Sequence, residues 1–203
     1  MKKETFTFSV RDISEIAVMC ALAIVLDRFV RIPIGSTGGS LNISTLPLFI
    51  VALRHGWFKG FIASGIVYGL TTCLLDAYGM QFFVFDYLIA FGSIGIGGLL
   101  SKIIFKQYEN KGAKGKVLAF LLVIVIVGIF FILRTLATSM DSMIFYGYTF
   151  WASIVYNVSY IGPSSIAVSV LLCVILPVIA MINGRYPSNY LKEDINDEVS
   201  EEE

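Results

Sequence analysis

Long apolar stretches without charged side chains dominate this sequence. Residues 117–133 carry no charge at all, and the whole chain is 57% hydrophobic and only 15% charged. A helix of a soluble domain keeps charged residues along its solvent-facing side, and such stretches have none. A helix of about 20 apolar residues crosses the roughly 30 Å hydrocarbon core of a bilayer. The sequence therefore predicts a helical membrane protein.

The apolar stretches and the polar, Gly and Pro residues between them predict an all-α membrane protein with six transmembrane helices. The second is too short to cross a bilayer without help from its neighbours. We expect these helices at residues 12–32, 43–54, 59–76, 80–105, 116–140 and 150–183.

The chain is expected to form one substrate-binding domain over residues 1–192, followed by an acidic, disordered tail over residues 193–203. The loop at 33–42 contains three glycines. It is either a lid over an outward-facing site or a plain connector.

Basic residues gather on one side of the predicted bundle. Twelve of the fifteen Lys and Arg residues fall on the side of the two termini, and only Arg28, Arg31 and Arg134 lie toward the other side. The positive-inside rule then places both termini in the cytoplasm. The sequence thus predicts a multi-pass protein of the cell membrane.

Metal, cofactor and nucleic-acid binding are not expected. Cys20, Cys73 and Cys173 lie inside apolar stretches without a CxxC spacing or a histidine companion, and they read as small buried hydrophobic residues. The basic residues lack the aromatic interleaving that is typical of nucleic-acid binding. Glycines inside the predicted helices, such as Gly65 and Gly95, are interpreted as sites of close helix packing.

Polar and aromatic side chains gather at the outer end of three predicted helices. Ionisable groups at membrane depth are costly and usually line a cavity. Asp86 lies near the outer start of the fourth helix, and Arg134 in the outer half of the fifth. A carboxylate, an amide and aromatic faces suit a flat, cationic heterocycle. The candidate substrate-binding residues are Asp86, Tyr87, Arg134, Trp151, Tyr156, Asn157 and Tyr160.

These candidates have structural alternatives. Asp86 and Arg134 can neutralise each other as an ion pair. Tyr146 and Tyr148 can belong to an aromatic belt at the membrane interface. Asn157 lies in an apolar helix and needs a hydrogen-bond partner, which is either a neighbouring helix or a ligand.

Several segments resemble one known family. They are Gly-Ser-Leu-Asn at 39–42, Leu-Pro-Leu-Phe at 46–49, Ala-Leu-Arg-His-Gly at 52–56, Phe-Asp-Tyr-Leu-Ile-Ala-Phe-Gly at 85–92 and Tyr-Asn-Val-Ser-Tyr at 156–160. Together they resemble the thiamine-specific S components of energy-coupling factor transporters. The resemblance spans most of the chain from about residue 10 to 185, and its combination of segments is more specific than any one of them.

The resemblance implies a high-affinity vitamin-binding subunit that captures thiamine or a close analogue from outside. It also implies partners, namely a membrane coupling protein and two ATPase subunits. Consistent with ATP hydrolysis on those partners, the chain has no Gly-x-x-x-x-Gly-Lys-Ser/Thr loop. Ala17 and Ala21 match the small residues with which the family's first helix contacts the coupling protein.

Carried over residue by residue, the family's acidic ligand contact falls on Asp86 and its sixth-helix asparagine on Asn157, while Trp151 or a neighbouring tyrosine stacks on the ligand. Two positions depart from the family. Ala152 replaces a usual tyrosine, and Arg134 stands where a histidine is usual. Because arginine favours carboxylates and phosphates, an S component for a different, anionic vitamin or precursor is the alternative.

Two remoter functions are an intramembrane enzyme and an assembly protein without a ligand. An enzyme needs a nucleophile or metal ligands beside a base, and the only histidine, His55, is expected in a cytoplasmic turn far from the outer candidates. In an assembly protein without a ligand, Asp86 and Asn157 would be costly to place within the membrane and would have no function. The sequence therefore favours transport.

Overall fold

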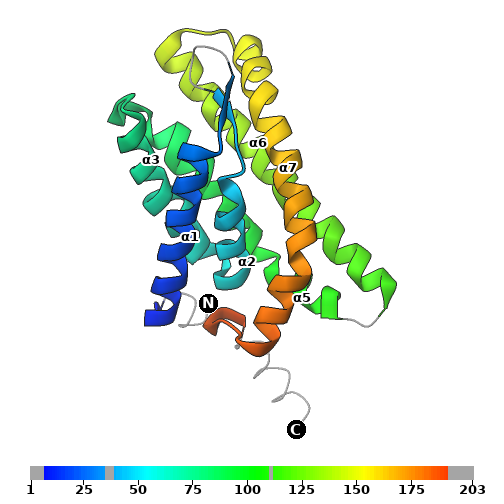
Figure 1. Ribbon diagram of the computed structural model, residues 1–203. Coiled ribbons are helices and arrows are strands. Elements are labelled where there is room, and N and C mark those ends of the chain that lie inside the picture. The colour runs from blue at the N-terminus through cyan, green and yellow to red at the C-terminus, as the bar shows by residue number, and fades with distance from the viewer. Residues whose placement is uncertain (1–6, 35–38, 110–111, 192–203) are drawn as a thin grey trace.

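The computed structural model describes residues 7–34, 39–109 and 112–191. Its helices form a bundle in which a small hairpin, the end of α6 and the start of α7 meet at one end, while α1 begins and α7 ends at the other (Figure 1). The elements are α1 (Val10–Phe29), β1 (Ile32–Ile34), β2 (Gly39–Leu41), α2 (Thr45–Phe61), η2 (Ile62–Tyr68), α3 (Gly69–Asp76), η3 (Met80–Phe82), η4 (Phe83–Ile89), α4 (Ala90–Gly92), η5 (Ser93–Leu99), α5 (Ser101–Glu109), α6 (Ala113–Tyr146) and α7 (Phe150–Arg185).

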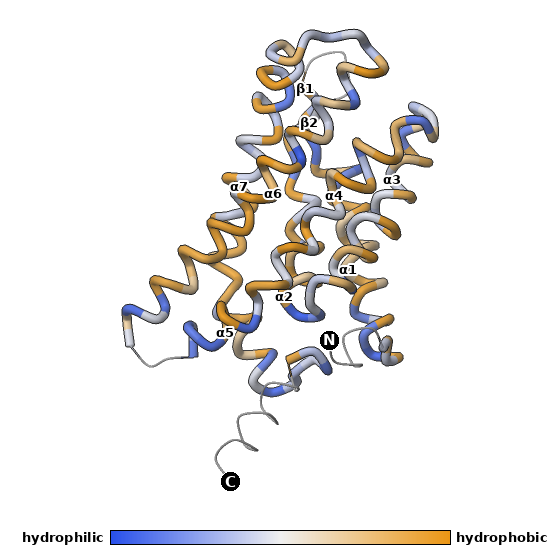
Figure 2. The backbone as a smooth tube through the Cα atoms, turned by 180° about the vertical axis from the view of Figure 1, so that it is seen from behind, coloured by the Kyte–Doolittle hydropathy of each residue, from blue (hydrophilic) through white to orange (hydrophobic). Residues whose placement is uncertain are grey.

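The described part of the chain is mostly helical, as expected of a membrane protein. It contains four helical stretches that are long and apolar enough to cross a membrane: Thr45–Asp76, Met80–Leu99, Ala113–Tyr146 and Phe150–Arg185. Apolar residues run along the outside of α6 and α7 (Figure 2). Large exposed side chains such as Leu121 and Val170 face outward there, which suits a lipid environment.

The first of these stretches is interrupted at Gly56. Its backbone angles, φ 84° and ψ 178°, lie outside the helical region, so α2 is divided into two helical pieces. Because a residue with a side chain avoids such a φ, glycine permits this break. The break coincides with the boundary that the sequence predicts between its second and third helices.

The stretch expected as one helix over 80–105 is less regular. It passes through the π-helical segment η4 and the 3-10 segment η5 and is interrupted before α5. Tight packing explains this, because a Cβ on Gly95 would lie 2.7 Å from the carbonyl oxygen of Trp57, and one on Gly65 would lie 2.9 Å from that of Leu88. The prediction that these glycines serve close packing is confirmed.

α6 is longer than the expected helix over 116–140. It runs on to Tyr146 and ends at Gly147, whose φ of 66° is the left-handed conformation that often terminates helices. α1 begins two residues earlier than expected because the Ser9 hydroxyl accepts from the Asp12 N–H while the Asp12 carboxylate accepts from the Ser9 N–H.

The loop expected at 33–42 contains a short antiparallel hairpin. Ile32 pairs with Leu41, and Ile34 with Gly39, while residues 35–38 lie outside the described part. The expected acidic tail, 193–203, also lies outside it. The hairpin adds a small β element to the predicted all-α fold, and it packs against α7.

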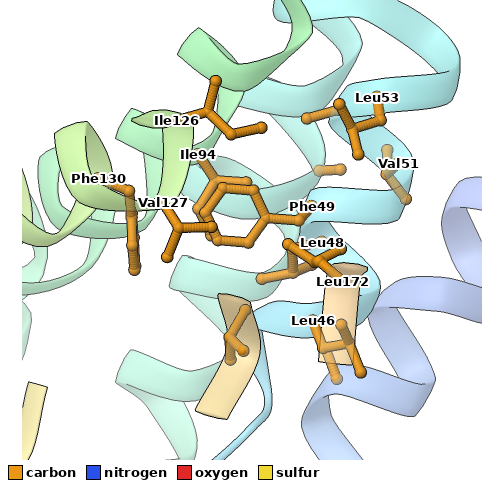
Figure 3. Close-up of a cluster of buried hydrophobic side chains, with 14 of the residues drawn as sticks. Leu46, Leu48, Phe49, Val51, Leu53, Ile94, Ile126, Val127, Phe130 and Leu172 are labelled. Atoms are coloured by element: carbon orange, nitrogen blue, oxygen red, sulfur yellow. The ribbon is translucent and has the colours of Figure 1, made fainter. Parts of the chain in front are cut away.

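The hydrophobic core lies between α2, η5, α6 and α7. Phe49 is completely buried, and its ring meets that of Phe130 edge to face at 5.2 Å between centroids. Ile94 of η5, Val127 of α6 and Leu172 of α7 complete this contact (Figure 3). The core joins the helices below the hairpin and thereby holds the hairpin end of the bundle in place.

Candidate ligand-binding site

A polar cavity lies at the hairpin end of the bundle. About 870 Å³ of space lies between its lining atoms, and this figure includes the open mouth of the cavity. Its walls come from α1, the hairpin, α3, the segment between α3 and η3, η3, η4, α4, α6 and α7. The lining residues are Asp27, Arg31, Gly39, Ser40, Asn42, Asp76, Tyr78, Phe82, Asp86, Tyr87, Phe91, Arg134, Thr138, Asp141, Ser142, Tyr146, Tyr156, Asn157 and Tyr160.

Two of the four aspartates on this wall have partners within the protein. Asp76 lies 2.9 Å from Arg28 and 3.7 Å from Arg31. Asp27 accepts a hydrogen bond of 3.3 Å from the Asn42 side chain and lies 3.7 Å from Arg28. These contacts tie α1, the hairpin end and α3 together around the cavity.

The other two aspartates, Asp86 on η4 and Asp141 on α6, have no ion pair or hydrogen bond with a described residue. Asp141 is only 3% exposed, and its Oδ1 atom is buried without a partner. A buried carboxylate without a compensating partner is unfavourable. The cavity thus presents two unbalanced carboxylates from two different walls.

Arg134 is the cation of this wall that has no carboxylate partner among the described residues. Its side chain is 9% exposed, its guanidinium lies over the rings of Phe91 at 4.6 Å and Phe130 at 5.8 Å, and its Nε atom has no hydrogen-bond partner. No contact within 4.0 Å joins Arg134 to Asp86, so the ion pair considered above is not present in this structure. Both groups are available to a ligand.

The amide and hydroxyl groups of the wall already bond to one another. The Asn157 side chain donates to the Ser139 hydroxyl at 3.0 Å and accepts from the Tyr160 hydroxyl at 2.8 Å. The Tyr156 hydroxyl accepts from the Gly39 N–H at 3.1 Å and so attaches the hairpin to α7. These contacts give the predicted residues Tyr156, Asn157 and Tyr160 a role in shaping the wall.

Tyr87 and Trp151 have different positions. The Tyr87 hydroxyl donates to the Asp76 carboxylate at 2.8 Å, and Tyr87 lines the cavity. Trp151 is 75% exposed and does not line the cavity, so the structure does not bring it together with the other candidate residues. The first turn of α7 directs it outward, where it meets Phe150 edge to face. Phe82 and Tyr146 are further aromatic residues of the cavity wall.

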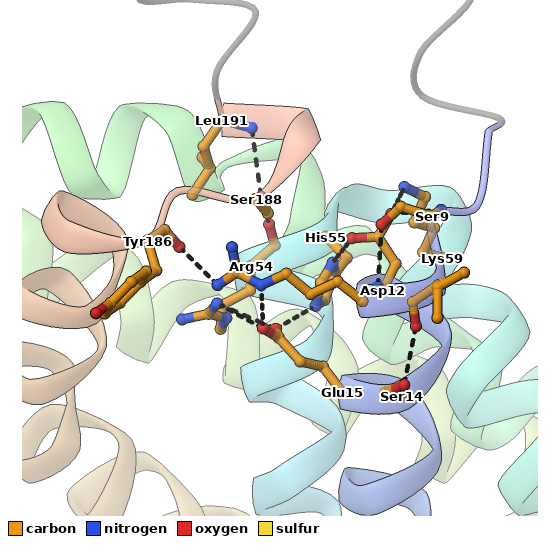
Figure 4. Close-up of polar contacts among 12 residues, drawn as sticks. Ser9, Asp12, Ser14, Glu15, Arg54, His55, Lys59, Tyr186, Ser188 and Leu191 are labelled. Atoms are coloured by element: carbon orange, nitrogen blue, oxygen red, sulfur yellow. Dashed lines mark hydrogen bonds and ion pairs between the residues drawn. The ribbon is translucent and has the colours of Figure 1, made fainter.

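His55 lies in a second polar cluster, which is formed by residues near the start of α1 and near Gly56 in α2. Its Nε2 atom is 3.0 Å from Glu15, and Lys59 is 2.8 Å from Asp12 (Figure 4). Lys59 is completely buried. None of these residues lines the cavity, in agreement with the expected separation of His55 from the outer candidates. Within the described ranges, no three His, Cys, Asp or Glu residues are grouped to hold a metal ion.

Comparison with known proteins identifies the family. The family model described as thiamine transporter protein matches residues 13–183. The chain is also 31% identical to the thiamine transporter ThiT of Bacillus subtilis, over 79% of this chain and 88% of that protein. This chain belongs to the thiamine transporter protein family. The family is one of transporters and not of enzymes, which agrees with the prediction from the sequence.

The fold also agrees with the family. The solved structure of ThiT from Listeria monocytogenes matches with a TM-score of 0.61 and 20% identity, over 89% of this chain and 97% of that one. The similarity at this level of identity concerns the fold. In this fold, the residues that were matched to the family's coupling surface, Ala17 and Ala21, are exposed on the outer face of α1.

Several charged or polar residues of the cavity wall were missed from the sequence, among them Asp141, Asp76 and Asn42. Asp141 was placed outside a helix because the fifth helix was expected to end at residue 140. On the longer α6 it lies seven residues after Arg134, a spacing that returns to the same face. Asp76 and Asn42 were missed because they lie at the ends of secondary-structure elements, where the pattern of apolar residues does not predict which way a side chain faces. A helix extended to Gly147 would have included Asp141.

Proposed function

We propose that this chain is the thiamine-binding S component of an energy-coupling factor importer. The observation on which the proposal depends is the polar cavity with the unpaired Asp86, in a chain of the thiamine transporter protein family. Thiamine consists of an aminopyrimidine, a positively charged thiazolium ring and a hydroxyethyl group. A carboxylate can accept from the amino group, and aromatic walls can hold the flat rings.

In this proposal Asp86 accepts a hydrogen bond from the pyrimidine amino group. Arg134 donates to an acceptor of the ligand, since its guanidinium carries donors and no acceptor. Asn157 and Tyr160 keep the α7 wall in shape, and Tyr156 holds the hairpin over the site. Trp151 has no part in binding.

The proposal includes six transmembrane helices with both termini in the cytoplasm of a plasma-membrane protein. The break at Gly56 divides one helical stretch into two crossings, and α1 supplies another. The cavity then opens to the outside. A membrane coupling protein contacts α1 at Ala17 and Ala21, and two ATPase subunits supply the energy. The exposure of both alanines supports this arrangement.

A second candidate ligand is an anionic vitamin or precursor, such as a phosphate ester of thiamine. The specific observation in its favour is Arg134, a buried guanidinium without a carboxylate partner. Arginine binds phosphate and carboxylate groups in a two-pronged geometry. Asp86 and Asp141 oppose this candidate, because carboxylates repel an anion in the same space.

Calorimetric titration of the purified protein in detergent tests both candidates. We expect thiamine to bind with a Kd below about 1 μM, which corresponds to more than about 8 kcal/mol of binding free energy. Thiamine monophosphate is titrated under the same conditions. Tighter binding of the phosphate ester than of thiamine would favour the anionic candidate, and no heat with either ligand up to about millimolar concentration would contradict the proposed function.

A further inference from the structure

Asp141 is a buried carboxyl group that has no cationic partner among the described residues. It lines the cavity from α6, is 3% exposed, and has one carboxylate oxygen buried without a partner. None of the described cations around the cavity forms an ion pair with Asp141. Arg28 and Arg31 pair with Asp76. Arg134 precedes Asp141 by seven residues, or about 10 Å along a helix.

The surroundings of Asp141 are aromatic. Tyr146 follows it on the last turns of α6, and the Tyr146 ring stacks on Phe82 with 5.6 Å between centroids and 21° between planes. Both rings belong to the cavity wall. The Tyr146 ring is also stacked on Tyr148, with 6.1 Å between centroids. Because these rings already stack on one another, the attraction of this wall for a cation comes from the carboxylate charge of Asp141.

A second carboxylate, Asp86, reaches the same cavity from η4. Two carboxylates in one space of low dielectric constant repel each other. A ligand stabilises both carboxylates only if it offers two separate positive or hydrogen-donating groups. Within the proposed function, thiamine has these two groups, because its amino group and its thiazolium ring lie on different halves of the molecule.

We propose that Asp141 is the counter-ion of the ligand's cationic ring. This inference rests on the proposed function and assigns the second half of the ligand. Asp86 serves the amino group, and Asp141 determines the preference of the site for a charged ring over a neutral ring of the same shape.

The test compares thiamine with an analogue in which a neutral thiophene ring replaces the thiazolium ring. We expect the wild-type protein to bind thiamine at least tenfold more tightly than the analogue. Asp141→Asn is expected to weaken thiamine binding at least tenfold and to change binding of the analogue less than about twofold. Asp141→Glu, which keeps the charge, is expected to retain a preference for thiamine. Glu109→Gln, at the end of α5 and outside the cavity, is the control for loss of a carboxylate.

The possible results of this binding experiment lead to different conclusions. Equal binding of both ligands by the wild-type protein would overturn the inference, and this result does not depend on whether any variant folds. An equal loss of both ligands in Asp141→Asn would assign Asp141 a structural role, and an unchanged preference would exclude it as the counter-ion. Failure of the wild-type protein to bind either ligand would instead contradict the proposed function.

Discussion

The aspartates of the cavity show how one residue type takes different roles according to its neighbours. Asp76 is held by two arginines and by the Tyr87 hydroxyl, so its charge is balanced before any ligand arrives. Asp86 makes no such contact with a described residue. Because an uncompensated carboxylate is costly within a membrane protein, this difference is the reason to propose Asp86, and not Asp76, as a contact of the ligand.

Replacement of Asp86 by Asn is therefore expected to weaken thiamine binding at least tenfold, or by about 1.4 kcal/mol. The amide keeps the shape of the side chain but removes the negative charge and one acceptor. Calorimetric titration measures the change, and a thermal melt checks that the variant is folded.

The control is again Glu109→Gln, which removes a carboxylate outside the cavity and is expected to leave the affinity unchanged. A well-folded Asp86→Asn variant with wild-type affinity would assign Asp86 to the structure of η4 and not to the ligand.

At the scale of elements, α1 is joined to α2 by buried ion pairs. Lys59 lies 2.8 Å from Asp12 and is completely buried, and Arg54 lies 3.0 Å from Glu15. A buried pair contributes little net stability when it is complete, but removal of one partner leaves an uncompensated charge. These pairs therefore specify how α1 sits against α2.

Lys59→Met is expected to lower the free energy of unfolding by about 3 kcal/mol or more, because Asp12 then loses its buried partner. Thermal unfolding in detergent measures the effect. The double variant Asp12→Asn with Lys59→Met is expected to recover part of the loss, since it removes the carboxylate charge that Lys59 no longer neutralises.

Arg11→Gln is the matched control, because it breaks an ion pair with Glu15 in which Arg11 is 46% exposed. Such pairs contribute less than about 1 kcal/mol. If the melting temperature of Lys59→Met were no lower than that of Arg11→Gln, the Asp12–Lys59 pair would have no part in joining α1 to α2.

In the whole molecule, two clusters of polar residues lie at opposite ends of the helix bundle. The cavity lies at the hairpin end, and the Asp12–Lys59 cluster lies at the end where α1 begins (Figure 1). The distribution of basic residues predicts that the cavity end is outside. In the proposed orientation, the cavity receives its ligand from outside the cell.

Single cysteines at the two ends test the orientation. Tyr148→Cys lies at the cavity end, and Gly112→Cys lies just before α6 at the other end, in a chain whose three native cysteines are replaced by serine. A maleimide that does not cross membranes is expected to label Tyr148→Cys on intact cells and Gly112→Cys only after permeabilisation. The reverse pattern would invert the proposed topology.

Much of this protein follows from local patterns in its sequence. Runs such as 117–133 require a lipid environment whatever the tertiary arrangement, because their surface has no polar group to offer water. Asp86 and Arg134 were expected at a cavity because such charges are too costly to face lipid, and the structure places both on its wall. Both inferences depend only on the cost of placing a side chain in a given solvent.

Other features depend on contacts between distant segments, and only the tertiary structure decides them. The packing of the helices decides whether Asp86 pairs with Arg134 and whether Trp151 faces the cavity. The length of α6 decides whether Asp141 lies on a helix. Gly147 ends α6, and the hairpin contact to Tyr156 connects residues more than 100 positions apart. A local pattern states what each side chain costs to bury, but the packing of the helices determines which of them meet.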